Sequence, residues 1–108
     1  MAIITLSEND SGKSIEVNQG DTIEIRLPEN PTTGYQWTVE EVDENILALQ
    51  SSEFVLPKDP QIGEGGTRVV QFQAKQAGSG EVALKYWREW EGDSSIIKWF
   101  KINVTVQL

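Results

Sequence analysis

Hydrophobic and polar residues alternate with a period of two along most of this chain. The alternation is clearest in six segments, residues 15–17, 22–27, 35–40, 70–74, 81–86 and 96–106. In the second of these, for example, Ile23, Ile25 and Leu27 share one parity, and the residues between them are polar. Such alternation is typical of a strand with one face in the core and the other in water. The pattern therefore predicts a set of half-buried β-strands.

Turn-forming residues occupy the gaps between these segments. Glycine, proline, asparagine and aspartate are concentrated in residues 18–21, 57–60, 77–80 and 91–93. Strand-like segments at this spacing, without a long helical segment, predict an all-β fold. We expect an immunoglobulin-like antiparallel β-sandwich of seven or eight strands. The one helix-like patch, residues 42–47, is short enough to be a single turn.

The length and composition predict one globular domain, residues 1–108. With 38% apolar and 24% charged residues, the chain has the composition of neither a disordered nor a membrane protein. No apolar run approaches the roughly 20 residues that span a bilayer, so we expect no membrane association. The first residues lack the basic and apolar regions of a signal peptide. The expected compartment is the cytoplasm by default, or the periplasm or cell exterior if a signal has been removed.

The charge and the missing residue types exclude several functions. The net charge is −8 and the nine Lys and Arg residues are scattered, which disfavours nucleic-acid binding. The acidity serves solubility or steers the chain toward a basic partner. Because Cys and His are absent, the sequence offers no disulfide, no thiolate or imidazole metal site and no Ser–His or Cys–His pair. We expect no enzymatic activity, no cofactor and no metal, and a core that packs around Trp37 without a disulfide.

The first stretch of interest is Asn30-Pro31-Thr32-Thr33-Gly34-Tyr35, just before a predicted strand. Pro31 fixes its own φ and disfavours the helical region for Asn30, so that residue is expected to be extended. Gly34 permits the positive φ of a sharp turn. The two threonines between them are stiff at χ1. These residues predict a pre-ordered tip with two hydroxyls on show, either as a simple turn or as a contact loop.

The second stretch runs from about residue 56 to residue 67 and contains Gly63, Gly65, Gly66 and Thr67. Its glycines predict flexibility or a close approach of the backbone to another surface. A phosphate-binding loop would be followed by a helix, whereas here a strand is predicted, so nucleotide binding is disfavoured. A surface loop without a partner remains an alternative.

The third stretch, residues 86–93, contains Tyr86-Trp87-Arg88-Glu89-Trp90. Tyr86 keeps the parity of the core, Trp87 falls on the opposite face, and Trp90 lies beyond the strand. Exposed Trp and Arg residues are typical of interface hot spots. A local alternative is that Arg88 stacks on one of the two neighbouring tryptophans. Trp99, in the middle of a predicted strand, is expected to serve packing.

In their order and spacing, the three stretches resemble the chagasin family of inhibitors of papain-like cysteine peptidases. Residues 30–35 are similar to the family's Asn-Pro-Thr-Thr-Gly-aromatic signature, and residues 63–67 to its glycine-rich middle loop. Residues 86–90 resemble its Arg-Pro-Trp loop, in which Arg88 and Trp90 match. Glu89 stands where the family usually has proline, which implies a less rigid third loop. The resemblance covers roughly residues 20–106.

The resemblance implies a sandwich that gathers the three loops at one end and places them in and around the active-site cleft of a papain-like peptidase. The first loop would enter the cleft, and the other two would clasp the enzyme on either side. The implied activity is reversible, competitive and non-covalent inhibition by a protein that is a monomer when free. The peptidase-binding residues that it implies are Asn30, Pro31, Thr32, Thr33, Gly34, Tyr35, Gly63, Gly65, Gly66, Thr67, Arg88 and Trp90.

Other classes of function also fit the residues. A carbohydrate-binding or adhesion β-sandwich would use Trp87 and Trp90 as a stacking platform for sugars. A structural module would form a stable oligomer within a larger assembly. A hydrolase is the weakest alternative, because carboxylates such as Glu89 and Glu91 lack an apolar pocket that would raise the pKa of a catalytic acid.

Overall fold

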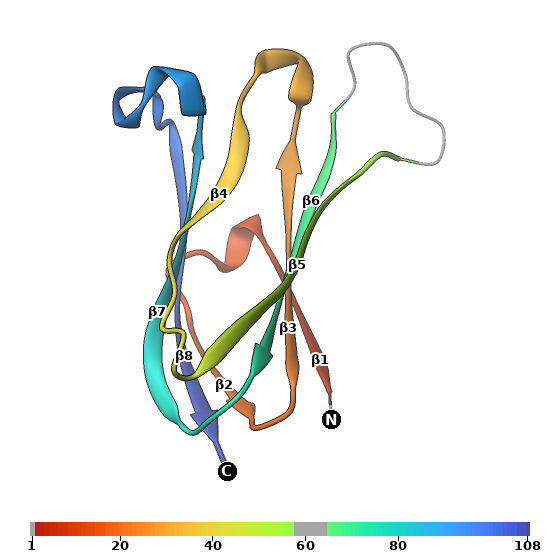
Figure 1. Cartoon of the computed structure of the whole chain (residues 1–108). Coiled ribbons are helices and arrows are strands. Elements are labelled where there is room, and N and C mark those ends of the chain that lie inside the picture. Colours follow the sequence, from red (N-terminus) through yellow and green to blue (C-terminus); the bar gives the residue numbers. More distant parts are fainter. Residues whose placement is uncertain (1, 58–64) are drawn as a thin grey trace.

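The computed structural model describes residues 2–57 and 65–108, and within them two four-stranded sheets face each other (Figure 1). The first sheet has the order β1 (Ile3–Ser7), β3 (Thr22–Glu29), β6 (Gly66–Ala74) and β5 (Leu47–Val55). The second has the order β2 (Ser14–Asn18), β8 (Lys98–Gln107), β7 (Gly78–Trp87) and β4 (Gln36–Glu41). Short 3-10 turns are η1 (Glu8–Asp10), η2 (Pro31–Thr33), η3 (Glu89–Glu91) and η4 (Asp93–Ser95). The predicted all-β sandwich of seven or eight strands is confirmed.

The direction of pairing is more varied than the predicted antiparallel sandwich. β3–β6, β5–β6, β4–β7 and β7–β8 pair in antiparallel fashion. β1 pairs with β3, and β2 with β8, in parallel. Neither parallel pair is a hairpin, because other strands separate its members along the chain. A tight hairpin turn forces two consecutive strands to be antiparallel, and this constraint does not apply to strands joined by longer connections.

The core lies between the sheets and follows the period-two pattern. Ile23, Ile25 and Leu27 are fully buried, as are Phe72 and Phe100 from the two central strand pairs. Trp37 is also part of this cluster and is only 3% exposed. Its indole N–H, which needs a partner when buried, donates to the carbonyl of Pro28 at 2.9 Å. The prediction that Trp37 packs at the centre without a disulfide is confirmed.

Several boundaries differ from the prediction. β1 and β5 lie outside the alternating segments, and β5 contains a bulge between Leu49 and Ser51 that interrupts its periodicity. The predicted turn at 77–80 is wrong from Gly78 onward, because β7 begins there. A Cβ at Gly78 would lie 2.7 Å from the side chain of Ile46, so this glycine allows close packing rather than a turn.

Two further predictions concern short segments. The last strand begins at Lys98 rather than at residue 96, because Ile96 caps the C-terminus of η4. The helix-like patch at 42–47 contains a single turn, in which the carbonyl of Asp43 accepts the N–H groups of Ile46 and of Leu47, the first residue of β5. In the described part of the chain, no helix is long and apolar enough to cross a membrane.

Candidate functional site

The β3–β4 and β7–β8 connections lie at one end of the sandwich, together with the end of β5 and the start of β6 (Figure 1). The β3–β4 connection forms the first loop, residues 30–35. The third loop, residues 86–93, begins in the last two residues of β7 and continues into the β7–β8 connection. The end of β5 and the start of β6 flank the second loop, residues 56–67. We call this region the loop end.

Only part of the second loop can be compared with its prediction. Gly63 lies outside the described residues. The sequence analysis placed Gly66 and Thr67 in the second loop, but they are the first residues of β6. Gly66 pairs there with Glu29. A Cβ at Gly66 would collide with the carbonyl of Val55, so glycine is needed here for the close approach of two strands.

The first loop is braced by its own backbone and by Asn30. Asn30 is extended, with φ −119° and ψ 103°, and Gly34 has a φ of +81°, which confirms both conformational predictions. The side-chain oxygen of Asn30 accepts the N–H of Thr32 at 3.1 Å, and the N–H of Gly34 donates to the carbonyl of Pro31 at 3.1 Å. The result is a short 3-10 turn with a capped start.

The sequence analysis expected two hydroxyls on show in this loop, but both threonine hydroxyls donate hydrogen bonds within the loop. Oγ1 of Thr32 donates to Oδ1 of Asn30 at 2.6 Å, and Oγ1 of Thr33 donates to the Asn30 carbonyl at 2.7 Å. The N–H of Tyr35 donates to Thr33 Oγ1 at 3.3 Å. The sequence could not specify these bonds, because either hydroxyl could equally have bonded to water. The loop is stiffened by them and is not a source of nucleophiles.

The third loop is held by Ser95, which the sequence analysis did not single out. The Ser95 hydroxyl accepts the N–H of Arg88 at 2.9 Å and lies within donating distance of the carbonyls of Arg88, 2.9 Å, and Gly92, 2.7 Å. Ser95 is buried, and its single side chain therefore closes the turn from Arg88 to Gly92. Ser95 thus braces the turn that contains Glu89.

Arg88 and Trp90 connect the third loop to the first. Nε of Arg88 donates to the carbonyl of Thr33 at 3.0 Å, and its guanidinium lies 4.4 Å from the ring centre of Tyr35. The local alternative for Arg88 is therefore corrected: among the described residues its cation–π partner is Tyr35, not a tryptophan. Trp90 is 72% exposed, yet a Cβ at Gly34 would lie only 2.5 Å from Cη2 of its indole. The two loops form one packed unit.

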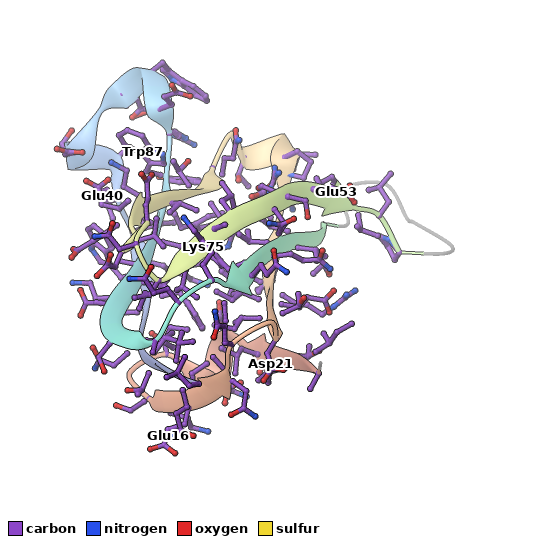
Figure 2. The ribbon with its side chains drawn as sticks, turned by 60° about the horizontal axis from the view of Figure 1, so that its bottom comes forward. Glu16, Asp21, Glu40, Glu53, Lys75 and Trp87 are labelled. Carbon is purple, nitrogen blue, oxygen red and sulfur yellow. The ribbon has the colours of Figure 1, made fainter. Side chains whose placement is uncertain are left out.

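Trp87 lies on the outer face of the second sheet, as its parity predicts. The ammonium of Lys85 is 3.5 Å from the centre of the Trp87 ring, and the indole N–H donates to Oγ1 of Thr38 at 3.0 Å. Lys85 also pairs with Glu40, and the hydrogen bond to Glu40 raises the pKa of Lys85. Figure 2 shows Glu40 and Trp87 near each other below the third loop. One face of the Trp87 ring is thus already occupied by a cation.

Two charged residues beneath the loops also escaped the sequence analysis. Glu29 is 4% exposed and forms an ion pair with Arg68 at 2.7 Å. The sequence contains a pattern that predicts the burial of Glu29. Glu29 continues the parity of Ile23, Ile25 and Leu27, so its side chain is expected to point toward the core. A carboxylate at a core position next to a loop marks a buried polar contact.

The loop end has the properties of a binding surface. In residues 2–57 and 65–108, no three His, Cys, Asp or Glu side chains gather in a way that could hold a metal ion. The sequence has no His or Cys to pair with a hydroxyl. The loops present an exposed indole and a stiff backbone. The charged pair of Glu29 and Arg68 lies buried beneath them.

Comparison with known proteins identifies this arrangement. The family model described as "Chagasin family peptidase inhibitor I42" matches residues 16–104. The chain belongs to the chagasin family. The family consists of peptidase inhibitors rather than enzymes, which confirms that this chain is not an enzyme.

Individual relatives agree with this assignment. Chagasin of Trypanosoma cruzi is 36% identical over 89 residues, which cover 78% of this chain and 80% of the relative. Amoebiasin-1 of Entamoeba histolytica is 31% identical over 107 residues and is covered over its full length, with 96% of this chain. The crystal structure of the cysteine protease inhibitor EhICP2 from the same organism superposes with a TM-score of 0.90 at 26% identity, covering 99% of this chain and 97% of the other.

Proposed function

We propose that the chain inhibits papain-like cysteine peptidases by laying its loop end across the active-site cleft, reversibly, competitively and without a covalent bond. The observation that carries the proposal is the packed unit of the first and third loops, in which Arg88 and Trp90 contact Thr33 and Gly34. The family is one of peptidase inhibitors, and the similar structure EhICP2 is described as a cysteine protease inhibitor.

The order of the first loop supports tight binding. A loop that becomes ordered only on binding loses affinity, at about 0.5–1.5 kcal/mol for each immobilised side chain. Here Pro31 fixes one dihedral angle, Asn30 accepts two hydrogen bonds from Thr32, and Arg88 holds Thr33. Much of the ordering cost is thus met before the peptidase arrives.

The same contacts explain how a loop in a catalytic cleft would resist cleavage. A peptide bond reacts only when its carbonyl is aligned with the nucleophile and the oxyanion donors. The carbonyl of Thr33 already accepts a hydrogen bond from Arg88, and that of Asn30 accepts one from Thr33. These carbonyls are held by the inhibitor itself, so the loop would occupy the cleft without presenting a substrate geometry.

Trp90 is the residue most suited to contact the peptidase. A large exposed indole is costly in water, and tryptophan is enriched among interface hot spots. Trp87 is less suited to the alternative sugar platform, because Lys85 covers one face of its ring and Thr38 binds its N–H. The structure therefore favours inhibition over carbohydrate binding.

The proposal is tested by titrating papain with the purified chain, with trypsin as a serine-peptidase control. We expect papain activity to fall with a raised apparent KM and an unchanged kcat, and to return on dilution. Trypsin should keep its activity. Equal inhibition of both enzymes, or of neither, would contradict the proposal, and cleavage of the chain during the assay would contradict the role of the first loop.

A further inference from the structure

A buried ion pair lies beneath the loop end. Glu29 is the last residue of β3, Arg68 lies near the start of β6, and their side chains are 3% and 13% exposed. Nη2 of Arg68 lies 2.7 Å from Oε2 of Glu29, and Nε lies 3.2 Å from Oε1. Two parallel contacts of this kind fix the orientation of a carboxylate as well as its charge.

The same carboxylate closes the first loop. Oε1 of Glu29 accepts the backbone N–H of Trp37 at 2.8 Å. Glu29 immediately precedes the first loop and Trp37 follows it, so this bond joins the two ends of the loop. It also joins the two sheets, because Glu29 belongs to β3 and Trp37 to β4, the edge strand of the second sheet. The carboxylate thus provides the acceptor that a neighbouring strand would otherwise supply.

Arg68 extends the network to the strands that flank the second loop. Its Nη1 lies 3.4 Å from the hydroxyl of Ser52, and its guanidinium lies 6.0 Å from the ring centre of Phe54, both in β5. On the other side, Glu29 pairs directly with Gly66 at the start of β6. One ion pair therefore connects the ends of the first loop to both stems of the second.

The surface above the pair lies between the first loop, Trp90 and the described ends of β5 and β6. A hollow of about 450 Å³ is lined by Glu29 and Arg68 together with Pro31, Gly34, Phe54 and Trp90. A second hollow, of about 360 Å³, also has Glu29 in its wall, beside Gly65 and Gly66. Glu29 belongs to both hollows, so a shift of its side chain would move the walls on either side of the first loop.

We propose that Glu29, held by Arg68, is a positioning residue for inhibition: it sets the shape of the first loop and its place relative to the end of β5 and the start of β6. The proposal rests on the function proposed above, because it assigns to the pair an effect on peptidase binding. Buried ion pairs are often replaceable by apolar residues without loss of stability. Orientation of the loops, rather than stability, is therefore the property that this pair supplies.

The test compares Glu29→Gln, Arg68→Gln and the double variant, by the inhibition constant for papain and by thermal unfolding. Each single variant leaves an unpaired buried group and loses stability. The double variant removes both charges and recovers much of that stability. We expect the inhibition constant to be raised about 10-fold in Glu29→Gln and to stay raised in the double variant. Two amide side chains cannot reproduce the pair of parallel hydrogen bonds between a guanidinium and a carboxylate. A merely structural role predicts that the inhibition constant returns with the unfolding temperature.

The matched control is the Glu24–Arg26 pair of the same strand, which is more exposed and lies further back along β3 from the first loop. Glu24→Gln with Arg26→Gln should leave the inhibition constant within about twofold of the wild type. Recovery of full inhibition in the Glu29–Arg68 double variant, or an equal loss in the control, would overturn the proposal.

Amide hydrogen exchange in the free protein separates this proposal from the function on which it rests. We expect faster exchange at Trp37 and in residues 33–35 of the folded double variant, with unchanged exchange at Gly20 and Asp21. Unchanged exchange throughout would refute the positioning role even if papain is inhibited. A wild-type chain that fails to inhibit papain would instead refute the proposed function, and the exchange rates would still decide whether Glu29 orders the first loop.

Discussion

The two ends of the sandwich are both ordered, but in different ways. At the end opposite the loops, the β2–β3, β4–β5 and β6–β7 connections bond to one another mainly through backbone groups. Gly20 donates to the carbonyl of Ala74 at 2.9 Å, and Lys75 donates to that of Ile46 at 2.7 Å. We call this region the turn end. At the loop end, bracing comes from the side chains of Asn30 and Ser95 and from Arg88.

The use of polar side chains shows the same difference. At the turn end, the carboxylate of Asp21 is buried and accepts the N–H groups of Ala2 and Asn18, both at 2.9 Å (Figure 2). At the loop end, the side chains of Asn30, Thr33 and Ser95 form hydrogen bonds within the loops. Trp90, in contrast, remains 72% exposed. Order alone does not mark a binding site, since both ends have it. Order combined with an exposed aromatic side chain distinguishes the loop end.

The largest expected effect comes from replacing Gly34 in the first loop, with Gly12 in the β1–β2 connection as its matched comparison. Gly34 and Gly12 have similar φ values, +81° and +92°, so alanine should cost each about 1 kcal/mol of stability. Only at Gly34 does a Cβ meet another residue, Trp90, while nothing lies within 4 Å of one at Gly12. We expect Gly34→Ala to raise the inhibition constant for papain roughly 100-fold, through combined strain and displacement of Trp90.

Gly12→Ala is the control for this experiment. It should lower the unfolding temperature as much as Gly34→Ala does, yet leave inhibition unchanged. Similar inhibition by the two variants would show that the contact between Gly34 and Trp90 has no role in binding, and that the packing of the loop end does not set it apart from the rest of the molecule.

The next effect concerns the exposed indole itself. Trp90→Ala should cost about 2 kcal/mol of binding, a roughly 30-fold rise in the inhibition constant, if Trp90 is a hot spot. Its exposure predicts a change in stability of no more than about 0.5 kcal/mol. The control is Trp99→Ala, because Trp99 is also exposed, at 42%, but belongs to β8 rather than to a loop, and the ammonium of Lys101 lies 4.7 Å from its ring centre. An equal loss in both variants would assign the effect to general surface changes rather than to the loop end.

The sequence was most informative where one residue alone determines the backbone. The period-two pattern located the inner faces of β3, β6, β7 and β8, because burial follows directly from parity. Asn30 and Gly34 have the predicted conformations, since Pro31 and the absence of a Cβ act locally. β5 was not found, because its bulge shifts the parity partway along the strand.

Contacts between residues distant in sequence were beyond prediction. Arg88 donates a hydrogen bond to Thr33 and stacks on Tyr35, both more than fifty positions away, although two tryptophans stand beside it in the sequence. Ser95 carries no signal as a loop brace, because serine is common in turns. Glu29 did carry a signal, its inward parity, but the partner that makes its burial tolerable, Arg68, is set by strand pairing between β3 and β6. Which residues face the peptidase stays a prediction.

The smallest expected effect is on stability alone. Acid and alkali should each weaken a different end of the sandwich, because the pKa shifts at the two ends have opposite directions. Hydrogen bonds from the N–H groups of Ala2 and Asn18 lower the pKa of Asp21. A carboxylate with a lowered pKa adds stability above its unfolded pKa, about 3.9, and loses it as the pH falls through the lower folded value. The hydrogen bond to Glu40 raises the pKa of Lys85, next to the third loop. That contribution is present below the unfolded pKa, about 10.4, and is lost as the pH rises through the higher folded value.

Acid should therefore weaken the turn end, and alkali the base of the third loop. Thermal unfolding across the pH range checks this with two variants, Asp21→Asn and Lys85→Met. The difference in unfolding temperature between Asp21→Asn and the wild type should shrink as the pH falls below about 3.9, and that of Lys85→Met should shrink above about 10.4. A difference that stays constant with pH would mean that packing, not charge, is what each side chain supplies. At neutral pH both groups are charged, so the two ends are braced together under the conditions in which inhibition would be measured.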